Sequence, residues 1–224
     1  DDIVTRDQLH AAHRVGAALG QGGWSGAPTD QPDAVVERRT PGPFVTHPQP
    51  RPPLEAERLR VVHDAGILDS RAERSFDDLA QRAAAAFDAP IALVTIIDAQ
   101  RQWAKACVGS RELVEVAREH SFCAHAVCAA EPLVVPDALR DERFSRLRPV
   151  TTDPWVRFYA GAPMLTSDGL ALGTVCVLDT VPRPRPTRDQ LDTLESLALV
   201  GAERIELRAR LHQLRAGDRA DLRR

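Results

Sequence analysis

A continuous apolar run at residues 91–98 constrains the fold more than any other feature of this 224-residue chain. The run is rich in β-branched side chains and lacks the polar alternation of a half-exposed strand, so it predicts a central strand covered on both faces. Residues 101–108 follow after a short turn and alternate between apolar and polar, which predicts an antiparallel partner strand nearer an edge. Residues 156–164 and 170–179 flank a Ser-Asp-Gly turn and predict a second hairpin.

Helices are predicted around these strands from apolar spacing and from capping residues. The predicted helices span 54–65, Ser70 to about Asp88, 122–130, and Thr187 to about Arg215. Ser70 and Thr187 each have Glu or Gln three residues later, which is the spacing of a capping box, and Ser121 is a third candidate N-cap. The segment 143–156 is expected to be an irregular loop. Helices combined with two antiparallel hairpins predict an α+β fold.

The chain divides into three parts by composition. Residues 1–53 contain 8 of the 17 prolines and 6 of the 13 glycines, so this stretch is expected to be a partly disordered leader or linker. Residues 54–215 are expected to form the folded domain with its long last helix. Residues 216–224 are expected to be a charged tail.

Charge and hydropathy exclude several classes of partner. The chain has 29 Lys and Arg against 32 Asp and Glu, a net charge of -3, so no direct binding to nucleic acid is expected. No window approaches the roughly 18 apolar residues of a membrane span, so no membrane association is expected. The four cysteines are too sparse for a disulfide scaffold, and no apolar export segment precedes them, which predicts a cytoplasmic location.

Eight short stretches appear in the order typical of one known family. They are 67–69, 76–77, 90–98, 101–105, 121–126, 141–144, 157–163 and 173–179. Together they make residues 54–212 resemble the GAF domain, a small-molecule-sensing and dimerisation module of bacterial signalling proteins. The resemblance implies an antiparallel sheet of five or six strands. It places the N- and C-terminal helices on one face, and short helices and loops over a pocket on the other.

The resemblance also implies a function in signal transduction. GAF domains usually regulate a histidine kinase, a cyclase or phosphodiesterase, or a transcription factor, so such an output partner is expected and the protein is expected not to be an enzyme. Two alternatives stay open. One branch of the family reduces free methionine sulfoxide with cysteines, and four cysteines are available here. The other alternative is a ligand-free dimerisation platform, in which large aromatic side chains fill the pocket.

Eight residues are candidates for ligand binding or sensing. They are Asp98, Trp103, Lys105, Arg118, Cys123, His125, Arg157 and Tyr159. Convergent cations among them could bind a small anionic metabolite through bidentate hydrogen bonds. The competing interpretation is structural: Arg157 would pair with Asp141 or Asp98 to hold the loops, and the two aromatic residues would belong to the core.

Cys123 is the candidate for redox sensing. In the first turn of a helix capped by Ser121, the partial positive charge would favour its thiolate. The alternative is a small buried residue that only fills space. A helix places Cys123 and Cys128 about 140° apart and His125 on another side, so the three side chains do not converge. No metal site is therefore expected, and the sequence identifies no cofactor.

The last helix predicts a second kind of contact. Apolar residues recur along it at alternating three- and four-residue steps, interrupted by Arg204; they are Leu197, Val200, Leu207, Leu211 and Leu214. One face of the helix can cover the sheet while the other pairs with a twin helix. A parallel homodimer through the C-terminal helix is therefore expected.

Overall fold

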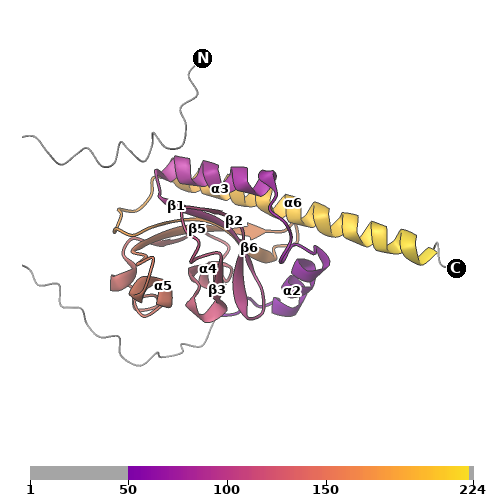
Figure 1. Ribbon diagram of the computed structural model, residues 1–224, viewed down its shortest axis with the longest axis horizontal. Helices are drawn as coiled ribbons and strands as arrows, with labels where there is room; N and C mark the ends of the chain where they lie inside the picture. The colour runs from indigo at the N-terminus through magenta and orange to yellow at the C-terminus, as the bar shows by residue number, and fades with distance from the viewer. Residues whose placement is uncertain (1–49, 222–224) are drawn as a thin grey trace, which may run out of the picture. The chain divides into compact units, whose positions relative to one another are not determined.

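A computed structural model describes residues 50–221, which form one six-stranded antiparallel sheet with helices on both faces (Figure 1). The sheet order is β3-β2-β1-β6-β5-β4. The strands are β1 (Ile91–Ile97), β2 (Arg101–Val108), β3 (Glu115–Ala117), β4 (Leu133–Val135), β5 (Phe158–Leu165) and β6 (Ala171–Asp179). The helices are α2 (Glu55–Asp64), α3 (Arg74–Phe87), α4 (Phe122–Ala126), α5 (Arg148–Thr151) and α6 (Arg188–Asp221), with 3-10 turns η1 (Arg118–His120) and η2 (Ala138–Arg140). The predicted α+β fold is confirmed.

The two central strands are covered on both faces, as the apolar run predicts. Every residue of β1 and of β6 is buried, and the two strands pair along their length from Ile91↔Leu178 to Ile96↔Gly173. The pairing of β1 with β2 shifts register between Val94 and Thr95, so Lys105 lies opposite no residue of β1. This irregularity is a β-bulge, which leaves one residue unpaired and redirects its side chain.

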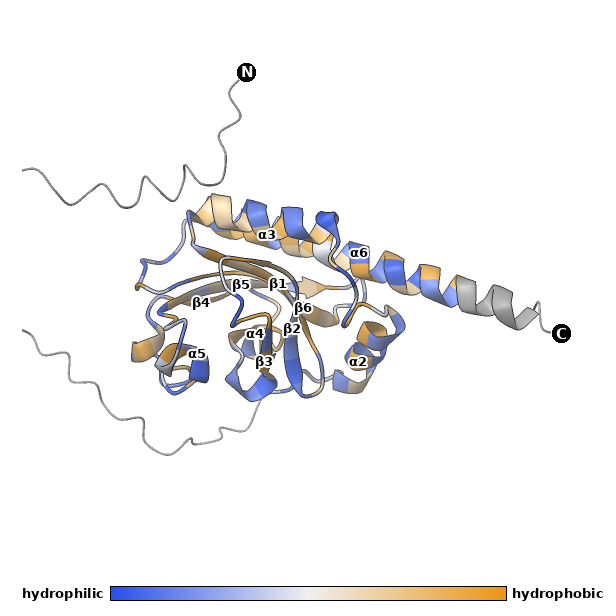
Figure 2. Cartoon of the chain, viewed as in Figure 1, coloured by the Kyte–Doolittle hydropathy of each residue, from blue (hydrophilic) through white to orange (hydrophobic). Residues whose placement is uncertain are grey.

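Two apolar layers lie on opposite sides of the sheet. Helices α3 and α6 pack on each other and on one face, where Phe76, Leu79 and Leu194 are nearly fully buried. The other face is covered by α4, α5, the 3-10 turns and loops, which bury Phe122 and Phe144. In Figure 2 the strands are coloured mainly as hydrophobic, while α3 and α6 carry both kinds of residue. None of the helices among residues 50–221 has the length and apolarity needed to cross a bilayer.

Two helix ends follow the predicted stop signals, but the predicted start of the second helix is wrong. Gly66 follows α2 with a φ of 55°, and Asp88 ends α3 with a φ of 45°. The prediction that Ser70 caps the next helix is wrong, because α3 begins at Arg74 with Glu73 as its N-cap. The Ser70 hydroxyl instead donates to the Ile67 carbonyl (2.6 Å) and accepts from Lys105 Nζ (2.7 Å).

The remaining boundaries shift by a few residues. Ser121 caps α4 as predicted, but the helix ends at Ala126 rather than Ala130. The predicted loop 143–156 contains the short helix α5. The Thr187 capping box is confirmed, since Gln190 N lies 3.3 Å from Thr187 Oγ1 and Thr187 N lies 3.0 Å from Gln190 Oε1. Helix α6 continues past Arg215 to Asp221; most of the predicted leader, 1–49, and the end of the predicted tail, 222–224, lie outside the described residues.

One carboxylate attaches α2 to the sheet by binding two buried arginines. Glu55 accepts from Arg58 Nε (2.8 Å) and Nη2 (2.9 Å), and from Arg118 Nη1 (2.5 Å). The side chains of both arginines are fully buried. They also reach the end of the central strand β1, because Arg58 donates to the Ile97 carbonyl (2.5 Å) and Arg118 to the Asp98 carbonyl (3.0 Å). Burial raises the pKa of Glu55, but the bonds from Arg58 and Arg118 outweigh it and lower the pKa to about 2.

We expect Glu55→Gln to destabilise the domain by about 2–4 kcal/mol. The substitution removes the negative charge shared by two buried guanidinium groups, and a buried charge without its partner is costly. Equilibrium unfolding in urea, followed by circular dichroism, measures the difference. Glu57→Gln is the matched control on the exposed side of α2 and should change the free energy of unfolding by less than about 0.5 kcal/mol. Equal effects of the two variants would contradict the role of Glu55.

Acid unfolding should reveal the same carboxylate. The pKa of Glu55 in the folded state is depressed from 4.5 to about 2, so its stabilisation is present above about pH 4.5 and is lost as the pH falls toward 2. The free energy of unfolding of the native chain should therefore fall over this range. The free energy of unfolding of Glu55→Gln should fall less steeply, because this variant lacks the Glu55 titration. Some fall should remain, because other carboxylates still titrate. Parallel pH profiles for the two proteins would show that Glu55 is not linked to folding.

Candidate functional site

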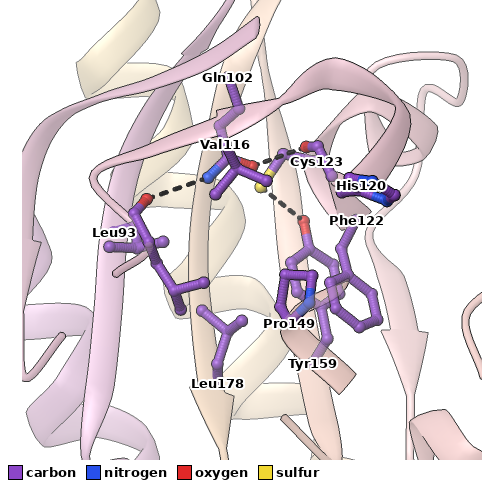
Figure 3. Close-up of a pocket in the computed structure, with 11 residues that line it drawn as sticks. Leu93, Gln102, Val116, His120, Phe122, Cys123, Pro149, Tyr159 and Leu178 are labelled. Carbon is purple, nitrogen blue, oxygen red and sulfur yellow. Dashed lines mark hydrogen bonds between the residues drawn. The ribbon is translucent and has the colours of Figure 1, made fainter. Parts of the chain in front are cut away.

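A small cavity lies between the sheet and the elements that cover its second face (Figure 3). Its volume is about 10 Å³, close to the minimum that holds one water molecule. The lining residues are Leu93, Gln102, Leu113, Val116, His120, Ser121, Phe122, Cys123, Pro149, Tyr159 and Leu178. The cavity therefore lies where the resemblance places a pocket, but it is nearly filled.

Stacked aromatic rings fill most of this space. The Phe122 ring lies 5.1 Å from that of Tyr159 at an interplanar angle of 12°, and 4.8 Å from that of Phe144 at 27°. All three side chains are almost fully buried. Such stacking adds to the free energy gained by burying the rings, so the filled state is well packed. Aromatic filling of this kind is what the ligand-free alternative predicts.

The cap of α4 determines which side chains reach the cavity. Ser121 Oγ accepts from the backbone N–H of Ala124 (3.0 Å) and donates to Gln102 Oε1 (2.6 Å). This bond to β2 holds the start of the helix against the sheet and places Phe122 and Cys123 in the cavity wall. The helix has only five residues, so the favourable helix charge expected at Cys123 is much reduced.

Two cysteines meet beneath this cap. Cys123 Sγ lies 3.7 Å from Cys176 Sγ. Figure 3 shows the Tyr159 hydroxyl, which donates to Cys123 Sγ at 3.5 Å. Each of these side chains has 2% exposure or less. Gly161 makes the arrangement possible, because a Cβ there would lie 2.1 Å from the Tyr159 hydroxyl and 3.0 Å from the Cys176 Cβ.

The protonation equilibria of the three groups are linked. Burial raises the pKa of Cys123, but the bond from Cys176 and those from nearby hydroxyl groups outweigh burial and hold this pKa below its ordinary value. Burial and the neighbouring Cys123 sulfur raise the pKa of Cys176 and that of Tyr159 well above their ordinary values. The contact between the two sulfurs therefore links the titration of Cys123 to that of Cys176.

The cations expected to gather around an anion lie in three separate places. Lys105 Nζ is on the helix-covered side, 2.8 Å from Glu73 Oε1. Arg157 directly precedes β5 and binds Asp137 through Nε (2.8 Å) and Nη2 (2.9 Å). Arg118 binds Glu55 near α2. These cations form no common anion site.

The expected partners of Arg157 are wrong, because Arg157 pairs with Asp137 rather than with Asp141 or Asp98. Asp141 binds Arg143 instead, at 2.9 and 2.7 Å. The backbone explains the exchange, because Ala138 N donates to the Arg157 carbonyl (2.6 Å) and so brings Asp137 beside the guanidinium.

The other candidates have local partners. Asp98 directly follows β1, and its Oδ1 lies 2.9 Å from Nε2 of His63 on α2. Trp103 packs half-buried against the helix-covered core. The His125 ring meets the edge of Phe144 at 4.9 Å. Within the part of the chain that the structure describes, no three His, Cys, Asp or Glu side chains are grouped to hold a metal ion.

Sequence reasoning missed Glu55 and Arg58 and did not pair Cys123 with Cys176. The i,i+3 spacing of Glu55 and Arg58 is a signal for an ion pair, but it does not show that the pair is buried or that Arg118 joins it. The two cysteines are 53 residues apart, and no local pattern relates them.

Comparison with known proteins identifies the family. Residues 71–205 match the GAF domain family. A curated relative, the cyclic di-GMP phosphodiesterase PA2567 of Pseudomonas aeruginosa, is 37% identical over 172 residues, which are 77% of this chain and 28% of that protein. The chain thus spans just over a quarter of this relative. The relative is named as an enzyme, which contradicts the prediction that this protein is not one.

Solved structures share the fold at low sequence identity. The GAF domain of an Acinetobacter phosphoenolpyruvate-protein phosphotransferase is 19% identical and covers 68% of this chain and 93% of its own, with a TM-score of 0.51. A domain of a putative two-component sensor histidine kinase from Sinorhizobium meliloti is also 19% identical (64% and 97% covered, TM-score 0.51). A type II free methionine-R-sulfoxide reductase from Thermoplasma acidophilum is 13% identical (65% and 94% covered, TM-score 0.50). With a six-stranded antiparallel sheet and a family match over residues 71–205, this chain belongs to the GAF domain family.

Proposed function

We propose that this GAF domain is a regulatory module that forms a parallel homodimer through α6 and controls an output of the cyclic di-GMP phosphodiesterase type. The output rests on the relative from Pseudomonas aeruginosa, whose match covers most of this chain. The observation that carries the proposal is a stripe of exposed leucines on the second half of α6, on the side of the helix opposite the buried Ile205 and Ala209. Kinase, cyclase and transcription-factor partners stay predictions.

Helix α6 has two parts with different surroundings. Its 34 residues span about 51 Å at 1.5 Å per residue. In the first part, Leu194, Ala198 and Ile205 are buried on the sheet. Figure 1 shows the second part projecting beyond the sheet. A helix that continues past its own core needs other contacts to be stable, because isolated helices are marginal in water.

Three leucines form a stripe on this projecting part. Leu207, Leu211 and Leu214 are 59, 44 and 67% exposed and follow one another at steps of four and three residues. This spacing keeps them on one side of the helix and is the spacing of a coiled-coil seam. A second copy of α6 in parallel would cover all three leucines of each helix. We therefore infer that the occupant of the stripe is a second copy of this chain.

The filled cavity favours the dimerisation-platform alternative over storage of a ligand. A volume of about 10 Å³ has no room for an anionic metabolite or for free methionine sulfoxide in the described conformation. The likeness to a methionine sulfoxide reductase concerns the fold alone. The signal that this module transmits would then be a change in how the cover of the sheet packs, passed to α6 through β5 and β6, both of which contact α6.

Charge in the leucine stripe should separate the dimer. We expect the native chain to be dimeric in analytical ultracentrifugation at micromolar concentration, and Leu207→Glu with Leu211→Glu to be monomeric, because the seam would then hold buried like charges. Leu199→Glu is the matched control: this leucine is 56% exposed on α6 but lies outside the stripe. The control should remain dimeric. A native chain that stays monomeric at every concentration, or a control that dissociates while the stripe variant does not, would refute the proposal.

A further inference from the structure

Four free cysteines lie on or near the second face of the sheet, but only two of them meet among the described residues. Cys107 is half-buried on β2, and its thiol donates to the Ser110 carbonyl. Cys128 is exposed after α4, with its sulfur 3.4 Å from the Ala124 carbonyl. Cys123 and Cys176 face each other from α4 and β6 at 3.7 Å. Their proximity has no role in the dimer described above.

We propose that Cys123 and Cys176 are an oxidation site at which a small hydroperoxide, such as hydrogen peroxide, forms a reversible disulfide. The site is built from a central strand and the short helix that covers it. Oxidation would therefore act on the cover of the cavity. Any effect of this bond on the output rests on the proposed function; formation of the bond does not.

The geometry requires only a small approach of the two sulfurs. A disulfide bond is about 2.05 Å long, so the 3.7 Å separation must shrink by roughly 1.6 Å. Cys176 lies on a fully paired central strand, between Leu93 and Gly161, and is held in place. Cys123 belongs to a helix of five residues that is joined to loops, so the cover can supply the movement.

The surroundings favour a small oxidant over a large one. Hydrogen peroxide has only two heavy atoms, so among hydroperoxides it requires the least widening of the cavity. Cys123 lines the cavity, whose volume of about 10 Å³ is on the scale of one water molecule. The cavity wall includes His120, whose side chain is 23% exposed, so this side of the cavity is near solvent. The Tyr159 hydroxyl donates to Cys123 Sγ, and this bond stabilises the thiolate, which is the reactive form of a cysteine.

The chemistry balances in two steps. The Cys123 thiolate attacks one oxygen of the peroxide: an S–O bond forms, the O–O bond breaks, and the leaving hydroxide takes up the proton released by the thiol. Cys176 then attacks the sulfenic sulfur: the S–S bond forms, the S–O bond breaks, and the second water leaves with the remaining proton. The two cysteines lose two electrons to the peroxide, and a thiol reductant returns them.

The disulfide would change contacts that hold the cavity filled. Cys123 would turn toward β6 and away from the Tyr159 hydroxyl. Its neighbour Phe122 stacks on Tyr159 and Phe144, so a shift of Cys123 moves the ring that closes the cavity. Strand β6, which carries Cys176, also contacts α6. Oxidation thus links the cover of the sheet to the helix that carries the leucine stripe.

The test uses the double variant Cys107→Ser, Cys128→Ser, which keeps only the proposed pair. After a short treatment with a few equivalents of hydrogen peroxide and alkylation under denaturing conditions, intact mass spectrometry should show loss of about 2 Da and no alkylated cysteine. Peptide mapping should find Cys123 joined to Cys176, and dithiothreitol should restore two alkylated cysteines. The native chain should form the same bond.

Three variants sharpen the assignment. Cys176→Ala should leave a sulfenic acid at Cys123 that dimedone traps, because the second step has lost its thiol. Tyr159→Phe should slow oxidation several-fold at neutral pH and less at alkaline pH, since it removes the bond that favours the thiolate; a purely structural role would not produce this pH dependence. Cumene hydroperoxide should react at least about tenfold more slowly than hydrogen peroxide, because it does not fit the cavity.

Other outcomes overturn the proposal. One is that both cysteines of the double variant are still free for alkylation after peroxide treatment. Another is that peroxide joins a different pair of cysteines in the native chain. A third is a stable sulfenic acid at Cys123 while Cys176 is present. Circular dichroism before treatment shows whether each variant is folded, so an unfolded variant is not counted. The two proposals can fail separately. If the native chain is monomeric but still forms the Cys123–Cys176 disulfide, the proposed dimer is refuted and the oxidation site is supported.

Discussion

Burial of both faces of the central strands is the constraint on which the rest of this structure depends. Strands β1 and β6 have no exposed residue, so each face of the sheet needs its own cover. On one face α3 and α6 supply long regular surfaces. On the other face the cover consists of helices of four or five residues, 3-10 turns and loops, which are held by side-chain bonds and by stacked aromatic rings.

The two covers differ in how they resist change. Gly201 lets α6 approach the sheet so closely that a Cβ there would lie 2.5 Å from Met164 Sδ. Close packing of this kind tolerates little movement without loss of contacts. The opposite cover has few backbone hydrogen bonds of regular structure, and its order depends on particular pairs such as Ser121 with Gln102 and Arg157 with Asp137. Local changes therefore cost less free energy on this side.

Much of the fold could be predicted because its signals are local. The β-branched run, the two hairpins, the Ser121 cap and the Thr187 capping box each depend on residues within a few positions of one another. The predicted Ser70 capping box is wrong because of a tertiary contact. Glu73, which would complete the box, instead binds Lys105 (2.8 Å) and Arg208 (2.6 Å). Local spacing permits a capping box, but a distant cation decides where the carboxylate goes.

The candidate site was less predictable, since its parts come from distant segments. Cys123 and Tyr159 were candidates by residue type, but the contacts of Cys123 with Tyr159 and with Cys176 arise only when α4 folds over β5 and β6. In the same way, nothing in the sequence near Glu55 distinguishes it from a surface glutamate, because its partner Arg118 is 63 positions away in the chain. The candidate cations Lys105, Arg118 and Arg157 lie far from one another, because each is paired with a carboxylate of its own.

These observations give the second face of the sheet a consistent role. Its polar groups are paired at the edges, by Glu55 at the α2 end and by Asp137 at the start of β5, and its centre is aromatic and sulfur-containing. Ion pairs fix where the cover attaches at its ends, whereas its centre is held by packing and by uncharged hydrogen bonds such as that of Ser121 to Gln102. A chemical change at the centre would then move α4 without releasing the edges. Strands β5 and β6 contact both α4 and α6. A movement of α4 could therefore reach the projecting helix through these two strands, which carry Tyr159, Gly161 and Cys176.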